Sequence, residues 1–173
     1  MNTKQEAPYL RKAEHNDVDQ IWAILQKAIE RRAADGSSQW QDGYPNKLTV
    51  ESDIARGIGY CLIDQNRVVG YCAVIENDEP AYEAIQGKWL SEGDFIVVHR
   101  VAIAEGYTGK GYAKTIFRLL EEHAKSRGIY SIKVDTNFDN MAMLAIVGKL
   151  AYSYCGEVFF RGSSRKAFEK LLS

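Results

Sequence analysis

Hydrophobic residues recur at three- and four-residue spacings in several stretches of the chain, and this spacing predicts amphipathic helices. Asp139 or Asn140 can cap one of these helices, and Thr49 can cap another. The expected helices run from Asn16 to near Gly36, from Thr49 toward Gly57, from Ala113 to Ala124, from Met141 to Leu150 and from Arg165 to Leu172.

Runs of β-branched and aromatic residues predict the strands, which are Tyr60–Asp64, Val68–Ile75, Phe95–Ile103, Ile129–Val134, Tyr152–Cys155 and Val158–Phe160. Three polar residues separate the first two, as in an antiparallel hairpin. The order strand, helix, strand over residues 95–134 implies a parallel pair. We therefore expect an α/β (α+β) fold, with a mostly antiparallel sheet, one parallel strand pair and helices on both faces.

Length and charge limit the kinds of protein this can be. The 173 residues suit a single domain spanning residues 1–173. With 22 Lys plus Arg against 23 Asp plus Glu, the net charge of −1 predicts no general attraction to nucleic acid or to an anionic membrane. Any highly charged ligand must therefore be held by local geometry.

The remaining composition points to an ordinary intracellular protein. Residues 1–8 are polar, and the sequence contains no run of eighteen apolar residues, so we expect a cytoplasmic location. Cys61, Cys72 and Cys155 are widely separated and lack the paired spacing of zinc or redox sites. We expect buried free thiols and no metal.

A glycine-rich turn is the first chemical signal. The strand ending at Ile103 leads into Gly109, Lys110 and Gly111, and a helix follows at once. The first amides of a helix lack intrahelical partners and carry the positive end of its dipole, so a phosphate group fits there. Neither the Walker A pattern nor the dinucleotide fingerprint matches, because the first needs Ser or Thr at position 111 and the second needs Gly at position 114. The alternative is a turn whose glycines only permit left-handed backbone angles.

The turn also carries a family resemblance. Thr108 to Ala113, with Gly111 and Ala113 as the matching positions, resembles the acetyl-CoA signature of the GCN5-related N-acetyltransferase (GNAT) family, Arg/Gln-x-x-Gly-x-Gly/Ala. A second segment, with Asn140, Lys149, Leu150 and Tyr152 at the family's spacing, extends the resemblance. The predicted order of elements also agrees with this family.

The resemblance implies a mixed fold in which two parallel strands splay apart around acetyl-CoA. Backbone groups of Val101, Ala102 and Ile103 would then bind its pantetheine arm, and Asn140 would bind the cofactor unless it only caps a helix. The backbone amides implied for the pyrophosphate belong to Gly109, Lys110, Gly111, Tyr112, Ala113 and Lys114. The implied reaction is direct attack of an amine on the acetyl thioester, without a metal.

The same resemblance suggests catalytic residues. His99 lies in the region where family members often place a base, although a histidine in an apolar strand is as readily structural. The family's proton-donating tyrosine is replaced by Val147, so Tyr154 is the substitute we consider, with core packing as its alternative. Thr108 stands where the family has Arg or Gln, so one side chain that would contact the phosphate or stabilise the turn is lost.

The acceptor and partners are less specified. Trp40, Asp42 and Tyr44 fall where family members build one wall of the acceptor pocket, and they favour a cationic amine; the alternative is a loop held by two buried aromatic rings. The expected acceptor is an amine of a small molecule or a peptide, and a homodimer stays open. Two other functions remain, a non-catalytic acyl-CoA-binding regulatory module and a nucleotide-phosphate-binding protein.

Overall fold

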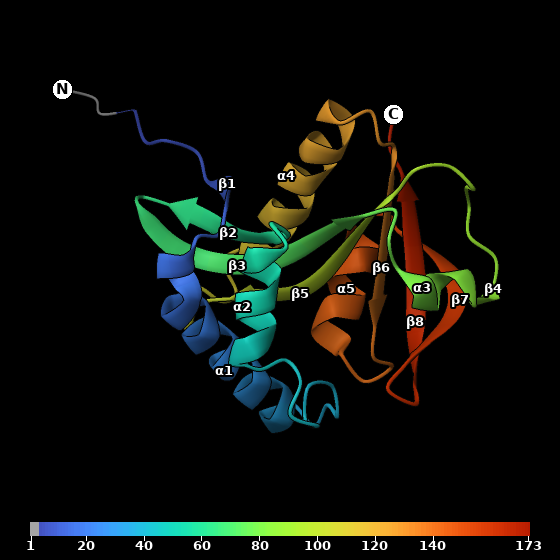
Figure 1. The fold of residues 1–173 in the computed structure, drawn as a ribbon, viewed down its shortest axis with the longest axis horizontal. Coiled ribbons are helices and arrows are strands. Elements are labelled where there is room, and N and C mark those ends of the chain that lie inside the picture. The colour runs from blue at the N-terminus through green and yellow to red at the C-terminus, as the bar shows by residue number, and fades with distance from the viewer. Residues whose placement is uncertain (1–3) are drawn as a thin grey trace.

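The computed structural model describes residues 4–173 and shows an eight-stranded sheet in the order β1-β2-β3-β5-β6-β8-β7-β4 (Figure 1). All neighbouring strands pair antiparallel except β5 and β6, which pair parallel. The fold class expected from the sequence is confirmed. The strands are β1 (Tyr9–Lys12), β2 (Gly59–Asp64), β3 (Arg67–Glu76), β4 (Gln86–Gly87), β5 (Ile96–Ile103), β6 (Ser131–Thr136), β7 (Ser153–Phe160) and β8 (Ser163–Leu171).

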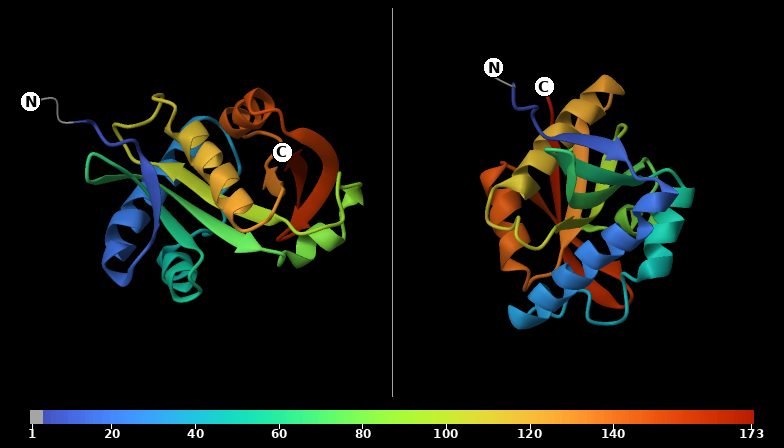
Figure 2. Two further views of the ribbon diagram at one scale, coloured as in Figure 1. Left: turned by 90° about the horizontal axis from the view of Figure 1, so that it is seen from above. Right: turned by 90° about the vertical axis from the view of Figure 1, so that its left-hand side faces the viewer.

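Helices cover both faces of the sheet, as the two views of Figure 2 show. Helices α4 and α5 pack on one face, and α1 and α2 pack on the other. None of the helices within residues 4–173 is long and apolar enough to cross a membrane. The helices are α1 (Val18–Ala34), preceded by a 3-10 turn (His15–Asp17), α2 (Lys47–Ala55), α3 (Pro80–Glu83), α4 (Tyr112–Ser126) and α5 (Met141–Lys149).

Alternation along the strands divides the core between the two faces. On β3, Cys72 and Val74 pack under α4, whereas Tyr71 packs against α1 and α2. Successive side chains of a strand point to opposite faces, so the long apolar run of β3 serves both cores. All three cysteines are buried, as predicted.

Strand β5 breaks this alternation at one place, and the break positions the site. Opposite β3, Ala73 pairs with His99 while Tyr71 pairs with Ala102, so β5 has an extra residue here. Arg100, at φ 54°, occupies this bulge. His99 and Arg100 consequently lie on the same face of the sheet, although they are consecutive in sequence.

Strands β5 and β6 pair only near their starts. The two register pairs are Ile96 with Ile132 and Val97 with Lys133, after which the strands are no longer bonded to each other. Strand β5 continues to Ile103 and β6 to Thr136. The unpaired lengths leave an opening in the sheet, as expected from the family resemblance.

The predicted C-terminal helix is wrong. Residues 163–171 form strand β8, in which Arg165, Ala167 and Glu169 are buried in alternation. Two of these three buried residues are charged, and charged residues are usually exposed. The alternation of buried and exposed positions in this strand is therefore not visible in the sequence as an alternation of apolar and polar residues. The turn at Arg161 and Gly162, both at positive φ, joins β7 to β8 as a hairpin.

Other elements differ in detail from the prediction. The two short strands expected after Tyr152 are a single strand, β7, with a register shift at Gly156. Strand β1, helix α3 and strand β4 were not predicted, since each has only two to four residues. The cap of α2 is Asn46 rather than Thr49, which completes a reciprocal capping box as the third residue of the helix.

Candidate active site

A cavity of about 330 Å³ lies where β5, the start of α4 and helix α5 meet. Eight of the predicted cofactor residues line it, and Thr108 joins them. They are Val101, Ala102, Ile103, Gly109, Gly111, Tyr112, Ala113 and Lys114. Lys110 is not among the lining residues, and its ammonium lies 5.5 Å from the ring centre of Tyr107.

The glycine turn shapes one end of this cavity. Gly109 and Gly111 have φ of 75° and 82°, a conformation that side chains rarely adopt, and no atom lies within 4 Å of where a Cβ would stand on either residue. Gly111 is the N-cap of α4 and supplies no side-chain cap. The first amides of α4 therefore face the cavity without a capping side chain, which suits them to bind an anionic group.

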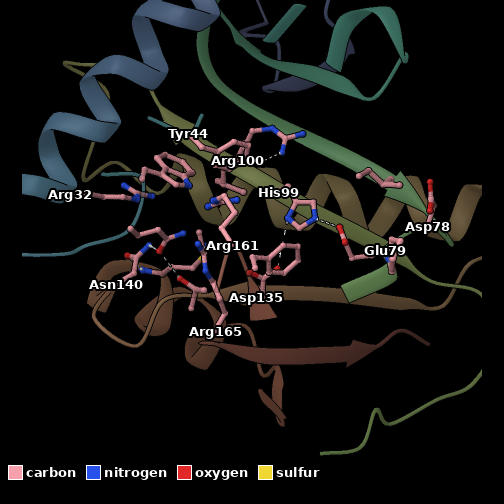
Figure 3. A pocket seen from close by; sticks show the side chains of 18 of the residues that line it. Arg32, Tyr44, Asp78, Glu79, His99, Arg100, Asp135, Asn140, Arg161 and Arg165 are labelled. Carbon is pink, nitrogen blue, oxygen red and sulfur yellow. Dashed lines mark hydrogen bonds and ion pairs between the residues drawn. The ribbon is translucent and has the colours of Figure 1, made fainter. Parts of the chain in front are cut away.

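A second cavity of about 370 Å³ adjoins the first and is lined by residues of both β5 and β6 (Figure 3). Its walls come from α1, the segment between α1 and α2, β5, β6, the start of α5 and the β7–β8 hairpin. Arg32, Val101 and Met143 line both cavities. A molecule held in one cavity is thus adjacent to a molecule held in the other.

His99 lies between two carboxylates in the second cavity. Its Nε2 is 2.7 Å from the carboxylate of Glu79, and its Nδ1 is 3.8 Å from that of Asp135, beyond hydrogen-bond distance. Tyr82 donates a hydrogen bond of 2.5 Å to Asp135, and burial together with this carboxylate raises the pKa of the Tyr82 phenol well above its usual value. A proton on Nε2 bonded to Glu79 leaves Nδ1 free to accept another proton.

Arg100 is held on the same face by a buried network. Its guanidinium binds both oxygens of Asp53 at 2.9 and 2.6 Å, and Asp53 also accepts a hydrogen bond of 2.6 Å from Tyr71. Arg100 donates in addition to the hydroxyl of Tyr44 at 2.5 Å. This network ties the β5 bulge to α2 and neutralises Arg100 within the site.

The predicted acceptor residues separate into two groups. Trp40 and Tyr44 line the second cavity, whereas Asp42 does not. Asp42 instead binds Arg161 at 2.9 Å, and this hydrogen bond is the main reason that its pKa is lowered. The guanidinium of Arg161 lies 4.0 Å above the ring of Tyr44. Asp42 thus binds an arginine of this chain.

Of the other predicted site residues, Tyr154 lies outside both cavities and the Asn140 side chain caps a helix. Tyr154 is 57% exposed, packs edge-on against Phe168 on the α5 side of the sheet and does not line either cavity. Asn140 lines the second cavity, but its Oδ1 accepts from the amide of Met143 as the N-cap of α5. Its Nδ2 donates to Gln39 at 2.9 Å. The helix-cap alternative therefore describes the Asn140 side chain.

Several site residues were not found from the sequence. Glu79 lies in the long connection before α3, and Asp135 lies near the end of β6. The arginines that line the second cavity were also missed; they are Arg32, Arg56, Arg100, Arg161 and Arg165. The only local signals were the unusual length of the 76–92 segment and an acidic residue at the end of an apolar strand.

Comparisons with known proteins agree with this arrangement. A family profile described as the acetyltransferase (GNAT) family matches residues 21–152. A GNAT-family acetyltransferase from Streptococcus agalactiae is 35% identical over 99% of both chains, with a TM-score of 0.89. The chain belongs to the GNAT acetyltransferase family.

More distant acetyltransferase structures share the fold. A putative acetyltransferase from Staphylococcus aureus is 24% identical, covering 95% of this chain and 99% of its own, with a TM-score of 0.71. A GNAT-family acetyltransferase from Listeria monocytogenes is 15% identical over 95% of both chains, with a TM-score of 0.76. No curated protein matches the chain significantly. In the GNAT fold of this chain, the glycine turn lines one cavity, His99 lines the other, and both cavities border β5.

Proposed function

We propose that this GNAT protein is an acetyl-CoA-dependent N-acetyltransferase, which transfers the acetyl group directly to a primary amine of a small molecule or a peptide. The observation that carries the proposal is the pair of cavities that meet at Arg32, Val101 and Met143. One has an anion-binding helix terminus, and the other has a histidine between carboxylates. Two substrates held in the two cavities can react directly, in a ternary complex.

The first cavity fits coenzyme A. Its apolar walls along Val101 and Ile103 suit the pantetheine arm, and the amides at Gly109, Gly111 and Tyr112 suit the pyrophosphate. The open space above both glycines allows a phosphate to approach the backbone closely. When bound there, acetyl-CoA supplies the activated acetyl group.

His99 would prepare the amine for attack. An ammonium group at neutral pH must lose a proton before its nitrogen becomes a nucleophile. His99 accepts this proton on Nδ1, while Glu79, 2.7 Å from Nε2, stabilises the resulting imidazolium. Asp135 adds a second negative charge 3.8 Å from the histidine, which attracts the incoming ammonium.

Protonation of the leaving thiolate would not need a tyrosine. Val147 is buried in the core at the position of the family's donor, and the residues that line both cavities, Arg32, Val101 and Met143, carry no hydroxyl or thiol. A thiolate with a pKa near that of free cysteine, ~8.5, is a tolerable leaving group that water can protonate. The cation of Arg32 lies at the junction and stabilises negative charge that develops there.

Two broader expectations are part of the proposal. The single sheet runs from β1 to β7 and β4 through adjacent strands, which supports one domain over the chain. Three buried free cysteines suit the reducing cytoplasm, where we place the protein.

The test mixes the protein with acetyl-CoA and a panel of amines, follows release of free CoA, and identifies N-acetylated products by mass spectrometry. We expect amine-dependent CoA release. Saturable CoA binding without any acetylated product would instead support a non-catalytic acyl-CoA-binding module. Stronger thermal stabilisation by ATP than by CoA would support a nucleotide-phosphate-binding protein.

Two matched glycine variants locate the cofactor. Gly111 and Gly128 both have positive φ, 82° and 72°, and open space at the Cβ position, but Gly128 follows the far end of α4. Alanine at either position strains the backbone by about 1 kcal/mol. We expect Gly111→Ala to raise the Kd for CoA about tenfold or more and Gly128→Ala to leave it unchanged. Equal effects on the Kd would show that the turn does not hold the cofactor.

A further inference from the structure

Two arginines of the second cavity have a buried Nε atom without a hydrogen-bond partner. Arg100 is neutralised by Asp53, and Arg161 binds Asp42. In contrast, Arg32 and Arg165 make no hydrogen bond or ion pair within residues 4–173, and the Nε atom of each is buried without an acceptor. Arg165 is only 8% exposed. The cavity therefore contains buried donors that the protein itself does not satisfy.

Such a charge is costly to the free protein. Burial lowers the pKa of Arg165, although the carboxylate of Asp135 opposes the shift, and burial also lowers the pKa of Arg32 to about 10. Buried charged groups are normally paired, and an unpaired one opposes folding. Ionisable groups perturbed by burial cluster at functional sites, where a ligand can supply the missing partner.

Aromatic rings orient both guanidinium groups. Arg32 lies 4.3 Å above the ring of Trp40, and Arg165 lies 5.9 Å from the ring centre of Phe160. A guanidinium that contacts a ring keeps its N–H donors free for a planar or tetrahedral oxyanion. Trp40 and Phe160 thus support the two groups without using their hydrogen-bonding capacity.

The opposite side of the cavity is acidic. Figure 3 shows Glu79 and Asp78 on one side of His99 and Arg32 and Arg165 on the other. An ammonium beside His99 and an oxyanion beside Arg165 would each meet the complementary charge. The volume of about 370 Å³ is near the lower limit for small-molecule sites, so both groups must belong to a compact molecule.

We propose that the acceptor is a small amine that also carries an oxyanion, a carboxylate or a phosphonate, and that Arg165 binds this oxyanion while the amine lies at His99. The proposal rests on the proposed function, because it names the substrate class of the same cavity. Amino acids and their close analogues are the simplest members of this class. Polyamines are disfavoured, because they would leave both guanidinium groups unpaired and add like charge.

The experiment compares matched acceptors. Each of the common amino acids is tested beside its carboxamide, which has nearly the same size and no negative charge, and beside the corresponding aminoalkyl phosphonate. We expect kcat/KM for CoA release to be at least tenfold higher for the best oxyanion acceptor than for its carboxamide. Turnover of carboxamides or polyamines with equal or higher kcat/KM would overturn the substrate class and leave the proposed acetyltransferase function standing.

A direct binding measurement tests the oxyanion site even if no acceptor is turned over. Titration calorimetry with the same amino acids and phosphonates, in the presence of CoA, measures the oxyanion site without chemistry. Saturable binding that carboxamides lack would support the site even if acetyl transfer failed. Absence of both turnover and binding for every oxyanion acceptor would refute the proposal, whatever the result of the CoA binding test.

Arg165→Gln separates a ligand role from a structural one. We expect a rise of about 10- to 100-fold in KM, or in Kd, for the oxyanion acceptor, as for loss of a hydrogen bond to a charged group, and no change in Kd for CoA. Its melting temperature should be equal or higher, because an unpaired buried charge has been removed. Arg165→Lys should restore part of the affinity. Arg118→Gln, at an exposed arginine of α4, is the matched control and should change none of these quantities.

A lowered melting temperature with an unchanged KM in Arg165→Gln would contradict the proposal and make Arg165 a structural residue. Arg32 is less suited to this test, because it lines both cavities and its replacement affects both substrates.

Discussion

The buried pair of Asp53 and Arg100 gives the sharpest prediction of stability. The Asp53 side chain is 2% exposed, and it accepts two hydrogen bonds from Arg100 and one from Tyr71. The side chain of Arg100 is 8% exposed. Asp53→Ala removes all three bonds and leaves the guanidinium buried with the hydroxyl of Tyr44 as its remaining hydrogen-bond partner.

The magnitude follows from two opposing terms. Three hydrogen bonds to charged groups are together worth roughly 4.5 to 9 kcal/mol, but the variant no longer has to desolvate the carboxylate. Removal of one member of a buried ion pair typically costs about 3 to 5 kcal/mol, and we expect that range here. For a protein of this size, each kcal/mol lowers the melting temperature by roughly 2 to 4 °C, which gives a fall of about 6 to 20 °C.

Urea unfolding followed by circular dichroism measures this change, and Asp19→Ala is the matched control. Asp19 is paired with Lys47 at 3.0 Å, but its side chain is 91% exposed, so its loss should cost less than about 1 kcal/mol. The double variant Asp53→Leu/Arg100→Leu should recover most of the stability lost in Asp53→Ala, since no buried charge is left alone. A cost below about 1 kcal/mol for Asp53→Ala would refute the view that this pair holds the β5 bulge.

Three other predictions concern thiols, pH and backbone contact. Burial raises the pKa of Cys61 to about 12 and that of Cys72 further. Both thiols should therefore resist iodoacetamide at pH 8 in the folded protein and react in urea, as measured by mass spectrometry. Rapid labelling of the folded protein would contradict this. Hydrogen bonds from Ser37, Ser38 and Asn137 outweigh burial and lower the pKa of Asp139 from 3.8 to about 2. The ionised carboxylate therefore stabilises the folded protein fully above pH 4, and this stabilisation is lost as the pH falls through 2. Asp139→Asn should flatten the acid unfolding curve between these two pH values. A Cβ on Gly87 would lie 2.1 Å from the carbonyl oxygen of Cys155, so Gly87→Ala should destabilise the protein by about 1 to 3 kcal/mol, whereas Gly93→Ala, with no atom within 4 Å, should not; equal melting temperatures would show that β4 adjusts freely.

Local patterns were sufficient for most of the fold. The apolar spacing of α1, α4 and α5 and the β-branched runs of β2, β3 and β5 predicted these elements, because each buries one continuous face or a whole strand. Strand β8 was not predicted, because its buried positions include the charged residues Arg165 and Glu169. The glycine turn was recognisable because a phosphate-binding helix terminus needs consecutive local residues.

The acceptor side of the site was less predictable for a topological reason. Glu79, His99 and Asp135 span 57 positions of the sequence, and the strand order β3-β5-β6 brings them together. The bulge at Arg100 then turns two consecutive side chains to one face, which no alternating pattern indicates. The unpaired state of Arg165 is likewise visible only once its neighbours are placed.

The central claim is that a proton passes to His99 when an amine takes the acetyl group from acetyl-CoA in the adjoining cavity. The most direct measurement uses acetyl-CoA labelled with ¹³C in the acetyl group, an oxyanion-bearing amine, and mass and NMR analysis of the product, for the wild-type protein and His99→Gln. The account predicts labelled acetyl on the amine nitrogen with the wild-type protein and a rate at least 100-fold lower with the variant at pH 7, as expected for loss of a general base. Labelled product formed at the same rate by both proteins would contradict the role of His99, and no labelled amine with the wild-type protein would contradict the acetyltransferase assignment itself.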